Sequence, residues 1–144
     1  MPRVAFDMDD TITANPKFFS FLSHAIKKAG GAVFVISSRT EIPEARQATY
    51  EELRECNIAF DDMILIPDMQ VAAEMCPIKE LNAYQKYIWQ KIRYCEEWNV
   101  SVYFDDEEAV VELFRQYAPK IQVFKVIKKP TRPCRSDGYN RDDL

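Results

Sequence analysis

The chain has 144 residues, 47% of them hydrophobic and 29% charged, so it has the size and composition of one domain with an ordinary core. A net charge of −4 at pH 7 argues against a protein built around bulk attraction to phosphate backbones, although a locally basic groove stays compatible with it. The four cysteines form no C-x-x-C pair, and no apolar run approaches the roughly 18 residues of a membrane span. We therefore expect a soluble, unexported protein, cytoplasmic with reduced thiols.

Short apolar runs alternate along the chain with longer amphipathic stretches. Asn15 and Pro16 have the character of an N-cap and a first helical residue, and Gly30 with Gly31 ends that helix. We expect strands at 4–6, 32–36, 63–66, 100–104 and 121–127, and helices at 16–29, 43–56, 81–95 and 108–117. This alternation predicts an α/β fold: a three-layer, Rossmann-like core with a five-stranded parallel sheet, helices on both faces and no cap domain.

The core is expected to span residues 1–127. Residues 128–144 form a polar, partly basic tail, and a solvated terminus is its simplest interpretation. In open α/β sheets, ligands bind beyond the carboxyl ends of the strands, at the point where the strand order reverses. The polar residues that follow the first, second and fourth predicted strands are therefore the candidate site.

The first predicted strand delivers two carboxylates into a polar turn. Asp7 and Asp9 are one residue apart, so they point to the same side of an extended chain. Neither belongs in a core unless it is paired or bound to a metal. The pattern indicates a place to bind a cation and to attack phosphorus; the alternative is a strand that simply ends in an Asp-rich turn.

The second predicted strand ends in Ser37, Ser38 and Arg39, which offer hydroxyls, backbone N–H groups and a guanidinium. These groups bind phosphate, although either serine alone is as well explained as a loop or capping residue. The fourth predicted strand ends in Asp105 and Asp106, which brings more carboxylates to the same edge. Carboxylate oxygens suit Mg²⁺, but Asp106 is also well explained as a helix N-cap.

A lysine is expected to balance the phosphate, and Lys79, Lys86 and Lys91 precede the fourth strand. Counting back from Trp98 at 1.5 Å per helical residue, Lys86 lies about 18 Å away, close to the length of a five-residue strand. This favours Lys86 at the ligand end. Lys79 then lies beyond the strand ends, as the second choice, and Lys91 too deep.

These motifs occur in one order along the chain, and together the ordered set resembles the haloacid dehalogenase superfamily of phosphotransferases. The residues that carry the resemblance are Asp7-Met8-Asp9-Asp10-Thr11, Ser37, a helix lysine and Asp105-Asp106. The resemblance covers roughly residues 4–126, and each motif alone is weak.

The resemblance implies a role for each matched residue. Asp7 becomes the nucleophile that forms an aspartyl phosphate, and Asp9 the general acid and base. Ser37 and Lys86 hold the phosphate oxygens, with Ser38 beside them. Mg²⁺ is held by Asp7, by the backbone carbonyl of Asp9 and by Asp106, while Asp105 supports the cluster. Because Asp9 is present, the family pattern favours phosphomonoester hydrolysis.

The substrate is less well specified. Neither usual cap position has room for a cap domain, since 67–78 is at most a small lid, and capless relatives act on macromolecules or form oligomers that cover one another's sites. A homo-oligomer is therefore left open. The pattern around 36–39, 86–89 and 100–106 looks similar to the phosphatase domain of polynucleotide kinase/3′-phosphatases, which would let Arg39 contact substrate phosphate. A nucleotide or sugar-phosphate phosphatase is the main alternative.

Two readings from other classes stay open. A receiver domain also has an acidic cluster and a phospho-accepting Asp, but its pattern requires Ser or Thr where Asp105 stands. A non-catalytic binding protein on the same scaffold is the second, because fold does not fix function.

The aromatic set Phe18, Phe19 and Phe21 is expected in the core rather than in a stacking surface.

Overall fold

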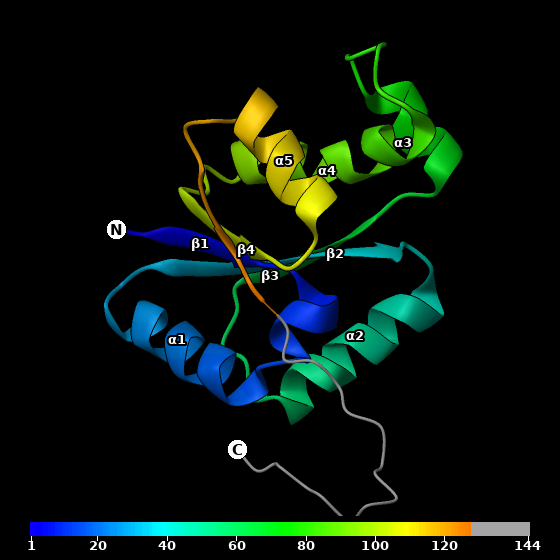
Figure 1. Ribbon diagram of the computed structural model, residues 1–144. Coiled ribbons are helices and arrows are strands. Elements are labelled where there is room, and N and C mark those ends of the chain that lie inside the picture. The colour runs from blue at the N-terminus through cyan, green and yellow to red at the C-terminus, as the bar shows by residue number, and fades with distance from the viewer. Residues whose placement is uncertain (128–144) are drawn as a thin grey trace, which may run out of the picture.

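The structure is a computed structural model that describes residues 1–127 (Figure 1); the predicted tail, 128–144, lies outside the described residues. The elements are, in chain order, β1 (Arg3–Phe6), η1 (Met8–Ile12), α1 (Pro16–Lys28), β2 (Ala32–Thr40), α2 (Pro43–Glu55), β3 (Asp62–Ile66), α3 (Met69–Met75), α4 (Ala83–Glu97), β4 (Val102–Asp105), α5 (Glu108–Tyr117) and β5 (Gln122–Lys125). Among residues 1–127, no helix combines the length and the apolar character needed to cross a bilayer.

The five strands form one parallel sheet in the order β3-β2-β1-β4-β5, which confirms the predicted α/β fold. β1 lies at the centre, between β2 and β4, so the strand order reverses at its carboxyl end. Ligands of doubly wound sheets bind at such a point. A receiver domain has the different order 2-1-3-4-5. The observed topology therefore contradicts the receiver alternative.

Helices cover the sheet on both sides, with α1 and α2 on one face and α3, α4 and α5 on the other (Figure 1). Because side chains alternate along a strand, each strand feeds two separate cores. Phe6 packs in the α1/α2 core and Ala5 in the other, and Phe104 and Tyr103 divide in the same way. Buried strands of this kind need apolar residues on both faces, which explains the continuous apolar runs in the sequence.

Most elements differ from their predicted bounds by one or two residues, and three larger or more informative differences lie in β2, α3 and α4. β2 continues to Thr40 instead of ending at Ile36, so the Ser-Ser-Arg segment lies in the strand, next to a register shift against β3. α3 is a short helix within the segment expected to be a small lid, and the Asp68 side chain caps it by accepting from the Val71 amide. α4 begins at Ala83 rather than Leu81, because Asn82 and Gln85 form a reciprocal capping box there.

Candidate active site

The nucleophile candidate is held rigidly where β1 ends. The Asp7 backbone N–H donates to the Phe104 carbonyl at 2.9 Å, which continues the β1–β4 ladder by one residue. The chain then turns sharply through η1, where Asp9 is extended (φ −70°, ψ 132°) and Asp10 is left-handed (φ 62°). Asp tolerates that conformation better than most residues, which explains an Asp at a position suited to glycine.

A buried lysine joins the ends of β1 and β4. The Lys91 ammonium donates to Asp7 Oδ1 at 2.9 Å and to Asp105 Oδ2 at 2.8 Å. All three side chains are at least 95% buried, with exposed fractions of 1% for Lys91, 5% for Asp7 and 1% for Asp105. Charges so deep in a protein are rare unless they are paired, and here one cation faces two anions.

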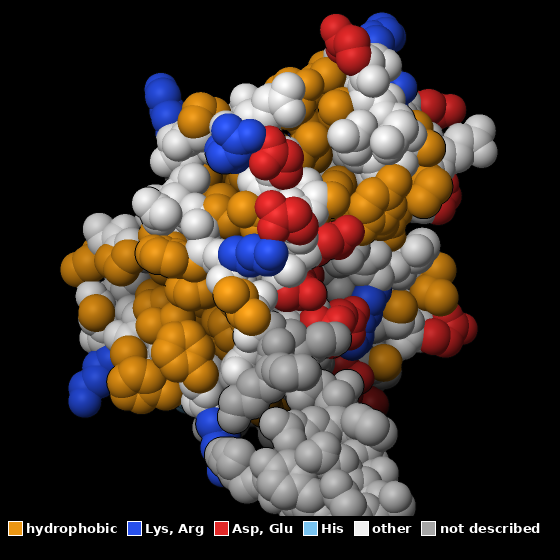
Figure 2. Space-filling view, viewed as in Figure 1, with side chains coloured by type: hydrophobic (Ala, Val, Ile, Leu, Met, Phe, Trp, Pro, Cys, Tyr) orange, Lys and Arg blue, Asp and Glu red, His pale blue; other side chains and the backbone are white. Residues whose placement is uncertain are grey.

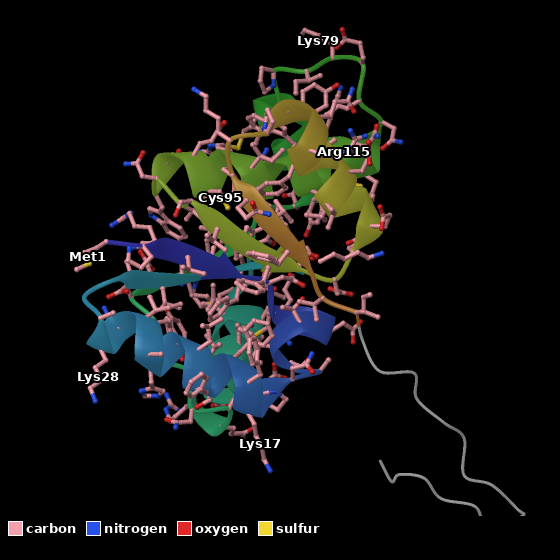
Figure 3. The ribbon with its side chains drawn as sticks, turned by 60° about the vertical axis from the view of Figure 1, so that its left-hand side comes forward. Met1, Lys17, Lys28, Lys79, Cys95 and Arg115 are labelled. Atoms are coloured by element: carbon pink, nitrogen blue, oxygen red, sulfur yellow. The ribbon has the colours of Figure 1, made fainter. Side chains whose placement is uncertain are left out.

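This lysine is not the one expected at the ligand end. The count of helical residues favours Lys86 there and leaves Lys91 too deep, but the Lys91 ammonium is the one that contacts Asp7 and Asp105. The helical rise from Trp98 to Lys91 is about 10 Å, and it omits the side chain, whose long stem points toward the helix N-terminus and so toward the ligand end. Within residues 1–127, no hydrogen bond or ion pair joins Lys86 to Asp7 or Asp105. Figure 3 shows Lys79 on a loop at the far edge of the molecule.

Asp105 has donors on both of its oxygens. Tyr103 O–H donates to Oδ2 at 2.5 Å, beside the Lys91 contact, and the Glu107 backbone N–H donates to Oδ1 at 2.9 Å. Burial raises the pKa of Tyr103 well above its ordinary value, and Asp105 adds to the effect, so the phenol stays protonated and keeps donating. Asp105 is thus locked in place by three donors.

Asp106 extends the acidic cluster toward the surface. Carboxylate oxygens of Asp7, Asp105 and Asp106 all lie within 4.8 Å of one another. The Thr11 hydroxyl lies between two of them, 3.2 Å from Asp7 Oδ2 and 3.3 Å from Asp106 Oδ1. Lys91 pairs with two of these three carboxylates, which leaves an excess of negative charge that a divalent cation with a preference for oxygen ligands would fit. Acidic side chains gather on this side, from α5 to the carboxyl ends of the strands (Figure 2).

The electrostatics of Asp7 reflect the same crowding. Burial raises the pKa of Asp7 above the ordinary carboxyl range, and the nearby Asp105 adds to the increase, while the Lys91 ammonium opposes it. Lys91 is affected in the opposite sense: burial alone would lower its pKa, but the two carboxylates outweigh burial and raise it. Lys91 therefore stays charged, and any further cation beside Asp7 favours its ionised, nucleophilic form.

Asp9, the second carboxylate of the motif, points away from this cluster. The Arg39 guanidinium binds both of its carboxylate oxygens in a bidentate fork, with Nε donating to Oδ2 at 2.9 Å and Nη2 to Oδ1 at 2.7 Å. Arg39 also donates to the Thr49 hydroxyl at 2.8 Å and to Glu52 at 2.6 Å, which anchors the guanidinium on α2. Arg39, expected to contact substrate phosphate, therefore contacts Asp9 in this structure.

The two serines of β2 differ in their surroundings. Ser37 is fully buried, and its hydroxyl accepts from the Arg39 backbone N–H at 3.1 Å. Ser38 is partly exposed, and its carbonyl accepts from the Tyr87 hydroxyl of α4 at 2.5 Å. Both lie at the carboxyl end of the strand beside β1, as expected, and their part in phosphate binding stays a prediction.

Comparisons with known proteins bear on the fold. No family model matches the sequence, and no curated protein does. Two similar solved structures are chains of the Pnkp1/Rnl/Hen1 RNA repair complex. One is 17% identical with a TM-score of 0.61, covering 89% of this chain and 43% of its own; the other is 18% identical with a TM-score of 0.58, covering 91% and 48%. This chain spans less than half of either. At such identities the likeness establishes the fold alone, so the superfamily resemblance stays a prediction.

Three side chains of the cluster were not predicted as site residues: Lys91, Thr11 and Tyr103. Thr11 was present in the quoted motif, and its position four residues after Asp7 in a tight turn was a usable signal. Tyr103 and Asp105 are two residues apart in β4, so their side chains lie on the same side of the sheet. Lys91 required the direction of its side chain, which a count of helical residues leaves out.

Proposed function

We propose that this protein is a Mg²⁺-dependent phosphomonoester hydrolase that works through an aspartyl-phosphate intermediate on Asp7. The observation that carries the proposal is the buried contact of the Lys91 ammonium with both Asp7 and Asp105 at the strand-order reversal. Two desolvated carboxylates held on one lysine are costly for a fold, which supports a catalytic purpose for them.

The proposed reaction has two displacements at phosphorus. An oxygen of Asp7 attacks, the bond from phosphorus to the ester oxygen breaks, and Asp9 gives that leaving oxygen a proton. Asp9 then takes a proton from water, whose oxygen attacks phosphorus and breaks the bond to Asp7, releasing inorganic phosphate. Lys91, in the role expected for Lys86, and Ser37 would neutralise charge on the phosphoryl oxygens.

In this proposal Asp9 acts while Arg39 holds its side chain in place. The fork holds both carboxylate oxygens but leaves the side chain 56% exposed, so it stays accessible to substrate. Because Arg39 is itself anchored on Thr49 and Glu52, it restricts Asp9 to one orientation. Arg39 would thus position the general acid and base.

Three carboxylates offer ligands for Mg²⁺, and their hydrogen bonds distinguish their parts. Both oxygens of Asp105 already accept from protein donors, so it would orient the cluster. Asp7 and Asp106 would bind the ion, with the Asp9 carbonyl expected beside them from the family pattern. Bound Mg²⁺ supplies charge neutralisation for the transferring phosphoryl group.

The substrate class we favour is a nucleotide or nucleic-acid end bearing a 3′-phosphate. The short resemblance to polynucleotide 3′-phosphatases and the fold similarity to chains of an RNA repair complex support this choice. A small sugar phosphate or nucleotide is the alternative, favoured by the acidic net charge.

The test is Mg²⁺-dependent phosphate release from a generic aryl phosphate, comparing the natural chain with Asp7→Asn. Activity in the first and a loss of at least about 1,000-fold in the second would support the proposal, because Asn cannot form the acyl phosphate. Chelation of Mg²⁺ should abolish the same activity. Equal activity in both proteins would rule out Asp7 as nucleophile.

A panel of 3′-phosphorylated oligonucleotides, mononucleotides and sugar phosphates then separates the substrate classes by kcat/KM. No turnover of the aryl phosphate or of any member of the panel would favour a non-catalytic binding protein.

A further inference from the structure

The end of β2 that carries the candidate phosphate-binding residues is irregular. The register of β2 against β3 shifts between Ser37 and Thr40, which leaves Ser38 and Arg39 without a register partner in β3. The register of β2 against β1 already ends at Val35. The peptide that joins Ser38 to Arg39 therefore lies outside both ladders, and its carbonyl and N–H need other partners. Strand bulges are over-represented next to active sites, where they reorient a side chain.

Two side-chain hydroxyls supply those partners. The Ser38 carbonyl accepts from the Tyr87 hydroxyl at 2.5 Å, and the Arg39 N–H donates to Ser37 Oγ at 3.1 Å. In a trans peptide the carbonyl and the N–H point in opposite directions, so these two contacts fix the peptide plane from both sides. By holding the carbonyl, Tyr87 sets the direction of the N–H that Ser37 accepts.

Tyr87 connects α4 with this part of β2. It lies one helical turn before Lys91 and is only 7% exposed. Its hydroxyl also lies 3.5 Å from the Thr40 hydroxyl, so the contacts of Tyr87 with Ser38 and Thr40 are the hydrogen bonds that join α4 to β2 within residues 1–127. A buried phenol needs a polar partner, and here that partner is the irregular segment beside Ser37. Tyr87 therefore fixes the segment of β2 that carries Ser37 relative to the helix that carries Lys91.

The Ser37 hydroxyl is oriented by this arrangement and keeps a proton to donate. Ser37 is fully buried, and its oxygen accepts from the Arg39 N–H. A serine hydroxyl can accept and also donate one proton, but no hydrogen bond within residues 1–127 gives that proton an acceptor. A buried donor without an acceptor requires an explanation. A phosphoryl oxygen bound beside Asp7 would be the acceptor.

We propose that Tyr87 is a positioning residue for phosphate binding: it holds the 38–39 peptide so that the Ser37 hydroxyl is turned toward a bound phosphoryl group. The inference rests on the proposed function and deepens it, because it places the orientation of the phosphate-binding serine under the control of a tyrosine on α4. Tyr87 itself does not contact the substrate in this proposal.

Arg39 lies on the same segment but has its own anchors. Its guanidinium donates to Thr49 and Glu52 of α2, so loss of the Tyr87 hydroxyl should leave Asp9 in place. A phosphate contact made equally in the ground state and the transition state affects KM and leaves kcat unchanged. We therefore expect Tyr87→Phe to raise KM for an aryl phosphate about 2- to 12-fold, the range for one neutral hydrogen bond, with kcat changed less than about twofold.

A double-mutant cycle tests whether Tyr87 acts through Ser37. The natural chain, Tyr87→Phe, Ser37→Ala and the double variant are compared by KM and kcat for the aryl phosphate with Mg²⁺. The Kd of inorganic phosphate with Mg²⁺ is measured in parallel by isothermal titration calorimetry. Once Ser37 is replaced, Tyr87→Phe should add less than about twofold to either constant, because both changes remove the same contact. Effects that multiply would mean independent contributions and would overturn the proposal.

Tyr94→Phe is the matched control, because Tyr94 lies on the same helix and its hydroxyl contacts Arg93 at 3.4 Å, outside the site. This variant should keep the KM and the phosphate Kd of the natural chain. Hydrogen exchange of the Arg39 amide, followed by NMR, should be about 2- to 12-fold faster in Tyr87→Phe and unchanged in Tyr94→Phe. Equal exchange in all three proteins would show that Tyr87 does not hold the peptide. Thermal unfolding of both variants checks that they are folded.

Turnover by the natural chain distinguishes failure of this inference from failure of the proposed function. Turnover with the same KM and phosphate Kd in Tyr87→Phe would overturn the inference and leave the phosphatase. Weaker phosphate binding and faster Arg39 exchange in Tyr87→Phe, without turnover by any of the proteins, would retain the positioning role and remove the phosphatase. A fall in kcat with KM unchanged would assign Tyr87 to the orientation of Asp9 and overturn the phosphate-binding role. Neither turnover nor phosphate binding by the natural chain would overturn both.

Discussion

Two helix lysines among the described residues pair with aspartates at strand ends, and they do so at opposite ends of the sheet. Lys27 of α1 pairs with Asp61 just before β3, and both side chains are more than a third exposed. Lys91 of α4 pairs with Asp7 just after β1, and both are almost completely buried. The first pair is an ordinary surface contact, worth about 0–1 kcal/mol.

The second pair gives the fold little net stability, because removing the charges from water costs about as much as their attraction returns. A well-packed apolar substitute would serve the core at least as well. Burial, rather than the presence of an ion pair, therefore distinguishes the end of the sheet that carries the candidate site. The pair of Arg39 with Asp9 is intermediate, with side chains 20% and 56% exposed.

The largest effect is expected from Lys91→Met, which leaves Asp7 and Asp105 buried without their cation. We expect a loss of about 3–5 kcal/mol in the free energy of unfolding, together with loss of the proposed phosphatase activity. Lys27→Met is the matched control and should cost less than about 1 kcal/mol. Urea unfolding of both variants measures the difference, and equal losses would contradict the contrast drawn between the two pairs.

The intermediate pair should affect catalysis more than folding. Arg39→Met removes the fork that orients Asp9, and we expect kcat to fall by up to about 100-fold, the effect of a misplaced catalytic group. Arg46→Met on α2 is the control, since Arg46 pairs with Glu41 outside the cluster. A rise in KM with kcat unchanged would show instead that Arg39 binds substrate phosphate.

Tyr103→Phe tests a single hydrogen bond within the buried cluster. It removes one of the three donors to Asp105 without changing the shape of the core. We expect a loss of about 1–3 kcal/mol in unfolding free energy, typical of a hydrogen bond to a charged group. Urea unfolding measures it, and an unchanged midpoint would mean that the Lys91 and Glu107 donors suffice.

The smallest effect belongs to the exposed pair and depends on pH. Burial alone would raise the pKa of Asp61, but the Lys27 ammonium and the Val33 amide outweigh it and lower that pKa. A carboxyl with a lowered pKa stabilises the fold above its unfolded pKa of about 3.9, and the benefit disappears as pH falls through the lower, folded value. The Tm difference between the natural chain and Asp61→Asn should therefore be present at neutral pH and shrink in acid. A difference that grows in acid would reverse the sign of this shift.

Much of this arrangement follows from the sequence because the elements are short and their ends are chemically marked. Apolar runs separated by amphipathic stretches fix the parallel sheet, and chain order brings Asp7 and Asp105 to one edge. The sequence pattern missed Lys91 because counting helical residues locates only the backbone of a lysine. Its ammonium lies at the end of a long side chain, several bonds from that backbone. Phe18 and Phe21, expected in the core, are 52% and 69% exposed. They were misplaced because hydrophobicity alone does not reveal that an apolar side chain is left uncovered.

The central place of β1 has a consequence for how the chain acquires its shape. Val4 pairs with Val33 on one side and with Val102 on the other, so one neighbour of β1 is made 98 residues after it. During synthesis from the N-terminus, that edge of β1 stays unpaired until β4 has been made. Unpaired strand edges can form hydrogen bonds with the wrong strand or with another chain. Contacts between distant residues also slow folding. A nascent chain that stops before β4 therefore has three of the five strands, an exposed apolar edge on β1, and an Asp7 without Asp105 beside it.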